Sequence, residues 1–287
     1  MSTPGFILTL SCPDRPGIVH AVSGLLFEQQ CNILDSAQYG DAFTNRFFMR
    51  VHFGAGQSTG LEALQAAFAP VGERFGMDWN IFDAGVRPRV LIMVSKIGHC
   101  LNDLLFRAKS GGLPVDVAAI VSNHRDFYQL AASYDVPFLH FPLLGATPEQ
   151  KAQQEAKVWE VVQEQSIDLV VLARYMQVLS DDLCRKLAGR AINIHHSFLP
   201  SFKGAKPYYQ AHDRGVKLIG ATAHYVTAEL DEGPIIEQDV ARVDHGMDPD
   251  QLTSMGRDVE CVTLARAVRW HAEHRILLNG HKTVVFR

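Results

Sequence analysis

In the first 84 residues, stretches with the hydrophobic spacing of a helix alternate with short apolar runs typical of strands. Apolar residues three and four apart predict two amphipathic helices, one over residues 18–30 and one beginning at Leu61. Four short apolar runs around them predict strands, at residues 6–10, 31–39, 45–53 and 77–82. The order β-α-β-β-α-β is that of the ferredoxin-like fold. We expect Asp14 to cap the first helix, with Pro16 in its first turn.

The pattern changes after a turn-rich joint at residues 85–89. Strand-like runs now alternate with helical stretches, which predicts an α/β domain with right-handed crossovers and a Rossmann-like, mainly parallel sheet. The expected strands lie at residues 90–94, 115–121, 138–141, 167–173, 191–194 and 234–240, and the helices at 99–110, 127–134, 148–165 and 249–274. Asn279-Gly280 predicts a closing hairpin. We therefore divide the chain into a domain over 1–84, a linker over 85–89 and a second domain over 90–287.

Composition then narrows the classes of partner. A formal net charge of −4 over 287 residues gives no general attraction to nucleic acid or to an anionic membrane. No apolar run approaches the roughly 18–20 residues of a membrane-spanning helix, and residues 1–17 lack the features of a signal peptide. Five scattered cysteines without a CxxC pair are typical of a reducing compartment. We therefore expect a cytoplasmic protein.

Candidate chemistry gathers where predicted strands end. Asn193 and His195 are two residues apart on one strand, so both side chains should leave the same face. Asp231 follows in the turn Leu230-Asp-Glu-Gly-Pro234. Each residue alone is more often a structural hydrogen-bonding group. Together, at strand ends of an α/β sheet, an amide, an imidazole and a carboxylate can polarise a carbonyl and move protons, and we take them as the catalytic set.

Three other chemistries find less support. A metal shared by His195 and His196 is disfavoured because neighbouring strand residues point to opposite faces, and no HxH or HExxH spacing is present. A serine hydrolase would use Ser197, but there is no G-x-S-x-G turn, so water is the better nucleophile. Without GxGxxG or GxxxxGK[ST] we expect no nucleotide, and we expect no other cofactor and no metal.

The first half resembles an ACT domain, through its element order and the segment Asp14-Arg-Pro-Gly-Ile-Val19 after the first strand. That resemblance implies an amino-acid effector near Asp14, Gly17 and Ile18, where a helix N-terminus would favour a carboxylate. A purely dimerising module is the alternative. Because ACT domains commonly pair, the resemblance also implies a homo-oligomer.

The second half resembles the folate-dependent formyltransferase family. The likeness rests on Asn193-Ile-His195, Ser197-Phe-Leu-Pro200 and Leu230-Asp-Glu-Gly-Pro234, and it spans about residues 89–287. It implies that Asn193, His195 and Asp231 are catalytic and that 10-formyltetrahydrofolate is the substrate. It also implies folate-binding residues on both walls of the site, namely Met176, Gln177 and Leu179 on one and His224 and Gly233 on the other.

Within that family the chain is similar to a branch in which an ACT domain precedes the formyltransferase-like domain and water is the acceptor. Lys96-Ile-Gly-His99 stands where ribonucleotide transformylases usually carry a phosphate loop, and His196 stands where they usually have proline. Phe202-Lys-Gly-Ala205 also resembles the hydrolase branch. We therefore expect hydrolysis to formate and tetrahydrofolate, which would supply formate for purine synthesis and balance one-carbon pools. A formyltransferase to an amine acceptor and a non-catalytic folate or amino-acid sensor are the alternatives.

Overall fold

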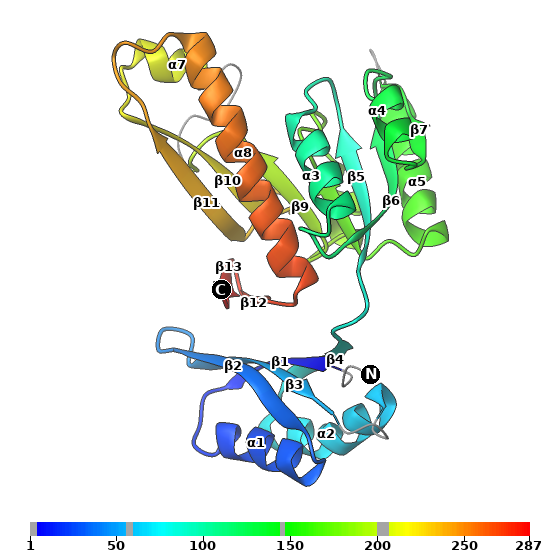
Figure 1. Cartoon of the computed structure of the whole chain (residues 1–287), viewed down its shortest axis with the longest axis vertical. Helices are drawn as coiled ribbons and strands as arrows, with labels where there is room; N and C mark the ends of the chain where they lie inside the picture. The colour runs from blue at the N-terminus through cyan, green and yellow to red at the C-terminus, as the bar shows by residue number, and fades with distance from the viewer. Residues whose placement is uncertain (1–4, 56–59, 144–146, 200–206) are drawn as a thin grey trace. The chain divides into compact units, whose positions relative to one another are not determined.

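The computed structural model describes residues 5–55, 60–143, 147–199 and 207–287. The chain divides into two compact units (Figure 1). The first contains residues 1–87 together with 273–279 and 283–287, and the second contains residues 88–272 and 280–282. Within the described ranges, no helix is both long enough and apolar enough to cross a membrane.

The first unit has the predicted ferredoxin-like order. Its six elements are β1 (Gly5–Pro13), α1 (Ile18–Glu28), β2 (Asn32–Asp41), β3 (Arg46–Gly54), α2 (Leu61–Phe75) and β4 (Asp78–Asp83). They form an antiparallel sheet of order β2-β3-β1-β4 with both helices on one face (Figure 1). The core between helices and sheet includes Leu8, Val22, Phe53 and Phe68, each almost fully buried. The α/β fold class of this domain is confirmed.

The predicted cap of α1 is wrong. Gly17 occupies the N-cap with a left-handed φ of 95°, and no side chain hydrogen-bonds to the exposed amides. A β-carbon is disfavoured at that backbone angle, so glycine begins the helix by its conformational freedom. Pro16 lies in the turn just before the helix, not in its first turn.

The last residues pack onto the other face of the same sheet. The predicted hairpin forms from β12 (Ile276–Asn279) and β13 (Lys282–Val285), and Gly280 takes φ 62° in its turn. Leu277 and Phe286 pack on Phe48 of β3. The sequence assigned 273–287 to the second domain, whereas most of this segment belongs to the first unit.

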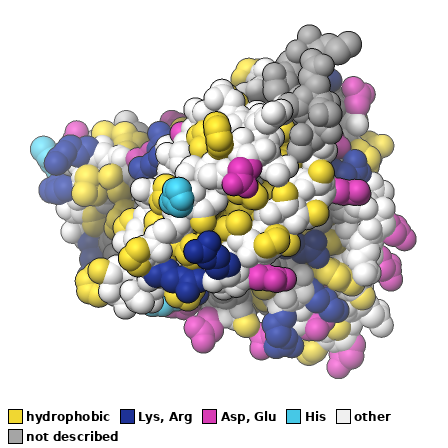
Figure 2. Space-filling model, turned by 90° about the horizontal axis from the view of Figure 1, so that it is seen from below, with side chains coloured by type: hydrophobic (Ala, Val, Ile, Leu, Met, Phe, Trp, Pro, Cys, Tyr) yellow, Lys and Arg dark blue, Asp and Glu magenta, His cyan; other side chains and the backbone are white. Residues whose placement is uncertain are grey.

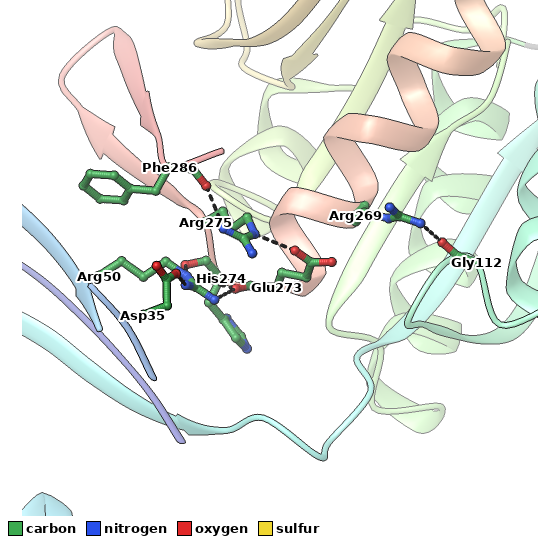
Figure 3. A network of polar contacts seen from close by, with 8 residues as sticks. All are labelled: Asp35, Arg50, Gly112, Arg269, Glu273, His274, Arg275 and Phe286. Atoms are coloured by element: carbon green, nitrogen blue, oxygen red, sulfur yellow. Dashed lines mark hydrogen bonds and ion pairs between the residues drawn. The ribbon is translucent and has the colours of Figure 1, made fainter. Parts of the chain in front are cut away.

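Arg50 of β3 fastens this segment to the sheet. Its side chain is 3% exposed, and its Nη2 donates to the carbonyl oxygen of Glu273 at 3.0 Å. Its Nε donates to the carbonyl of His274 at 3.2 Å, and its Nη1 pairs with Asp35 at 3.1 Å (Figure 3). The ring of His274 stacks on Phe82 with centroids 3.7 Å apart. A buried guanidinium therefore satisfies two backbone carbonyls in the turn that precedes β12.

The second unit is a seven-stranded sheet of order β11-β10-β9-β8-β5-β6-β7. Its strands are β5 (Arg89–Val94), β6 (Asp116–Ser122), β7 (Phe138–His140), β8 (Leu169–Leu172), β9 (Ala191–His195), β10 (Leu218–Tyr225) and β11 (Ile235–Arg242). Strands β5 to β9 are parallel, and β10 and β11 join antiparallel. The predicted mainly parallel sheet is confirmed.

Six helices accompany this sheet in the described part of the unit: α3 (His99–Lys109), α4 (Tyr128–Ser133), α5 (Pro148–Glu164), α6 (Asp181–Lys186), α7 (Pro207–Asp213) and α8 (Pro249–Ala272). Asp248 caps the start of α8, since its Oδ1 accepts from the amides of Asp250 and Gln251. From β5 the chain continues to β6 and β7 on one side, and it returns to form β8 and β9 on the other side. In such a sheet a binding crevice opens at the carboxyl ends of the strands where the order reverses, and polar groups at the ends of β8 and β9 lie beside it.

Candidate active site

A cavity of about 350 Å³ lies at the carboxyl ends of β8 and β9. Asn193 and His195 line it, as does Asp231 from the connection between β10 and β11. The segment after β8 forms an apolar wall with Met176 and Leu179, beside Gln177. The structure therefore brings the three predicted catalytic residues to one cavity with four of the five predicted folate contacts, the fourth being His224.

His195 and Asp231 form the central pair. Asp231 takes a left-handed φ of 57°, a backbone region that aspartate tolerates better than most residues. This turn places its Oδ2 3.2 Å from Nδ1 of His195. The hydrogen bond from His195 holds the pKa of Asp231 well below its usual value, so it is a carboxylate at neutral pH. Nε2 of His195 is buried without a hydrogen-bond partner among the described residues, which leaves it for a bound molecule.

His224 supports the other polar group, Asn193. The antiparallel register of β9 and β10 sets the two residues opposite each other, and His224 Nε2 lies 3.2 Å from Asn193 Nδ2. His224 Nδ1 is 2.9 Å from the carbonyl oxygen of Tyr225, which can only accept, so Nδ1 carries the proton. In the neutral ring Nε2 then accepts from the Asn193 amide. His224 thus lines the cavity and also orients a predicted catalytic side chain.

Gly233, which is expected to contact folate, is not among the residues that line the cavity. It is buried against the end of β10, where a β-carbon would collide with the carbonyl oxygen of Tyr225. Glycine is therefore required so that the turn carrying Asp231 can approach the strand.

His196 corrects a second expectation. Strand β9 ends at His195, so the alternation of faces no longer applies to the next residue. The two imidazoles stack, with centroids 5.0 Å apart and planes at 19°, and both line the cavity. Ser197 is buried and does not line it. Residues 200 and 202–205 of the quoted motifs lie outside the described residues.

One group of three possible metal ligands occurs in the part of the chain that the structure describes: His99, Cys100 and Cys261. None of the three lines the cavity. The absence of a metal stays a prediction, and no step below uses one.

The residues expected to hold an effector are not all together. Gly17 lines a separate cavity of about 440 Å³ on the helical face of the first unit, with Arg15, His20 and Arg74. Ile18 is buried in the domain core, and Asp14 is not part of this lining. Figure 2 looks onto the molecule from below and shows basic side chains gathered beside hydrophobic ones on that face.

Sequence reasoning missed Arg174 and Glu229, which also line the cavity. It could have singled out Arg174, since a charged residue directly after a buried strand of a parallel sheet stands at the binding edge.

Two family patterns cover the chain. The one described as an ACT domain matches residues 5–81, and the one described as formyl transferase matches residues 88–268. A formyltetrahydrofolate deformylase of Corynebacterium sp. (strain P-1) is 53% identical over 98% of both chains. That of Escherichia coli K12 is 40% identical over 97% of both. The chain belongs to the formyltetrahydrofolate deformylase family.

Solved structures agree with membership of that family. The structure of the formyltetrahydrofolate deformylase from Burkholderia mallei is 57% identical, with a TM-score of 0.94, and covers 99% of this chain and 100% of its own. Glycinamide ribonucleotide transformylase 1 from Symbiobacterium toebii is 32% identical with a TM-score of 0.65, and covers 70% of this chain. The deformylases therefore match both units, whereas this transformylase covers a smaller part.

Proposed function

We propose that this protein hydrolyses 10-formyltetrahydrofolate to formate and tetrahydrofolate. The observation that carries the proposal is the arrangement of Asn193, His195 and Asp231 around one cavity, in a chain of the deformylase family. An amide and an imidazole nitrogen facing a cavity can stabilise the oxyanion that forms when a formyl carbon is attacked.

The reaction follows from these groups. The formyl oxygen accepts hydrogen bonds from Asn193 and from Nε2 of His195, while Asp231 holds the opposite edge of that ring at 3.2 Å. The oxygen of a water molecule bonds to the formyl carbon, and the carbon–N10 bond then breaks. One proton of the water ends on N10 and formate leaves as the anion, releasing the second proton. Asp231 stabilises a positive charge on His195 as that ring handles protons.

The cavity wall beside Asn193, His195 and Asp231 suits a flat, partly apolar ring system. Met176 and Val178 are about half exposed at the cavity and offer apolar surface to a ring. Gln177 adds an amide that can read polar ring edges. We infer that this segment holds the pterin ring of the folate, as the family resemblance implies.

Release of formate without an added acceptor tests the proposal. Purified protein with 10-formyltetrahydrofolate should yield formate and tetrahydrofolate in equal amounts. Asn193→Ala should fold normally and lose about 10²–10³-fold in kcat, because one oxyanion donor is gone. Consumption of 10-formyltetrahydrofolate that requires an added amine and releases no formate would favour a transferase. Binding of the folate without any consumption would favour a sensor. Either result rejects hydrolysis.

A regulatory ligand is the second part of the proposal. The cavity beside Gly17 offers two guanidinium groups, Arg15 and Arg74, and Phe75 gives it an apolar side. A small carboxylate such as an amino acid matches this combination. Titrating glycine and methionine against activity, in the native protein and in Arg74→Ala, tests it. An effect of either amino acid that persists in the variant would place the effector elsewhere.

We further propose a cytoplasmic homo-oligomer. The edge strand β2 exposes Leu34 and Tyr39, and an open edge with apolar side chains favours pairing. All five cysteines are free, as expected for a reducing compartment. Sedimentation equilibrium reporting a monomer at micromolar concentration would reject the oligomer. In the cell, formate release would serve purine synthesis and the balance of one-carbon pools.

A further inference from the structure

A second polar cluster adjoins the cavity through Arg174, and its centre is Glu260 of α8. This side chain is 1% exposed, and both carboxylate oxygens are occupied. Oε1 accepts from the Tyr208 hydroxyl at 2.7 Å, and Oε2 lies 2.8 Å from Nε2 of His99 and 3.4 Å from Nε of Arg174. Three separate segments therefore converge on one buried carboxylate.

Such a group is costly to bury. A carboxylate removed from water loses several kcal/mol of hydration unless ion pairs and hydrogen bonds replace it. Here burial raises the pKa of Glu260, but the hydrogen bond from His99 and the charge of Arg174 outweigh it, and the pKa stays below its usual value. Glu260 is thus charged at neutral pH, and the cluster holds a full Arg174–Glu260 ion pair in the interior.

Arg174 connects this cluster to the active site. Arg174 lines the cavity together with His195 and His196, although its side chain is only 9% exposed. Its backbone has a left-handed φ of 64°, which is uncommon for arginine, and its carbonyl oxygen accepts from the amide of Ser95. The structure holds this residue in an unfavourable conformation, with its charge beside the two stacked imidazoles.

The charge of Arg174 acts on His196. Burial, then Arg174, then His195 lower the pKa of His196 to about 4, against the opposing effect of Glu260 and Asp231. The remaining aromatic neighbour is Tyr208, 6.5 Å away between ring centroids. At neutral pH His196 is therefore an uncharged ring with one nitrogen able to accept a hydrogen bond.

We propose that His196 binds the attacking water through this acceptor nitrogen, and that Glu260 is a positioning residue that holds Arg174 where it keeps His196 uncharged. The inference rests on the proposed hydrolysis and names the residue that receives its second reactant. So weak a base does not take the proton from water. It orients the water oxygen toward a formyl carbon held at His195, the ring on which His196 is stacked at 5.0 Å.

Two substitutions of His196 test the water-binding role. His196→Asn keeps a neutral acceptor of similar reach, whereas His196→Ala removes it. We expect His196→Ala to lose about 10²-fold or more in kcat, with KM for the folate little changed, and His196→Asn to retain at least ten times more activity than alanine. Equal activities of the two variants would overturn the role, as would wild-type kcat in His196→Ala.

Arg174 and Glu260 are tested through the pH profile of kcat, which a purely structural role would not move. Arg174→Gln removes the charge that opposes protonation of His196, so the acid limb should move up by about one pH unit or more. The double variant Arg174→Gln/Glu260→Gln also removes the carboxylate that favours protonation of His196, and it leaves no unpaired buried charge. The acid limb of its kcat profile should therefore return toward the wild-type position. Asp258→Asn, an exposed carboxylate on the same helix, is the matched control and should leave the profile unchanged.

The outcomes separate the two proposals. If the native protein releases no formate, hydrolysis itself fails. If the native protein is active and Asn193→Ala is not, but the acid limb stays fixed in folded Arg174→Gln, only the positioning proposal fails. Circular dichroism and thermal melting establish that each variant is folded, and the charge-balanced double variant supplies the measurement if Arg174→Gln alone does not fold.

Discussion

Asp231 Oδ2 lies 3.2 Å from Nδ1 of His195, while the other nitrogen of that ring is buried and faces no hydrogen-bond partner in the described structure. The carboxylate comes from a turn and the imidazole from a strand end, so the pair depends on how closely that turn approaches the sheet. One edge of the ring is fixed by the protein and the other is left for the substrate. Several expectations depend on this geometry.

Replacing Asp231 with asparagine should abolish most turnover. The amide keeps the size of the side chain but loses the charge that stabilises a protonated His195, and a comparable change in a catalytic triad costs about 10⁴-fold. We expect kcat for formate release to fall by about 10²–10⁴-fold with normal folding. Glu232→Gln, the neighbouring exposed carboxylate, should remain near wild type. Comparable activity in both variants would contradict a role for the Asp231–His195 pair.

His196 should make stability depend on pH in a defined window. Its pKa is about 4 in the folded protein and 6.5 in an unperturbed chain, so between these values the unfolded state binds more protons. The free energy of unfolding should therefore fall as the pH drops from 6.5 to 4, by up to about 3 kcal/mol in total. Urea denaturation at several pH values measures it. His196→Asn should lack this component, and parallel curves for the two proteins would show that His196 is not the cause.

Gly233→Ala should weaken both the fold and the site. The added methyl group would collide with the carbonyl oxygen of Tyr225, so the turn must move and take Asp231 with it. We expect a loss of about 1–3 kcal/mol in the free energy of unfolding and a marked fall in kcat. Gly112→Ala is the control, because its β-carbon would meet its nearest neighbour at an ordinary 3.6 Å. A variant with unchanged stability and kcat would mean that the turn can yield.

Arg50→Met should loosen the last hairpin from the first unit. The change leaves the carbonyls of Glu273 and His274 without their buried donor, and hydrogen bonds to a charged group are each worth about 1.5–3 kcal/mol. We expect a lower melting temperature and faster proteolytic cleavage near residue 273. Asp35→Asn removes only the half-exposed ionic partner and should cost about 1 kcal/mol or less. If both variants melt alike, the carbonyl contacts contribute little.

Most elements of both units could be predicted because their apolar periodicity is local, although the short helices α6 and α7 were not expected. Contacts set by register could not. His224 lies opposite Asn193 only because β10 runs antiparallel to β9, and 31 residues separate them in the chain. The burial of Glu260 could not be predicted for another reason. A glutamate in a long helix is ordinarily exposed to solvent, and only the convergence of three distant segments buries this one. Asp14 was chosen as a cap by residue type, but a glycine takes that position by its backbone angle.

The return of residues 273–287 to the first sheet has a consequence for how the protein is made. In chain order, the formyltransferase-like unit is an insertion between two parts of the ACT unit, and the polypeptide crosses from one to the other near residue 87 and again near residue 272. During synthesis, strand β3 emerges long before the hairpin that covers Phe48 and pairs with Arg50. The sheet of the first unit therefore completes its packing only after the second unit has been translated.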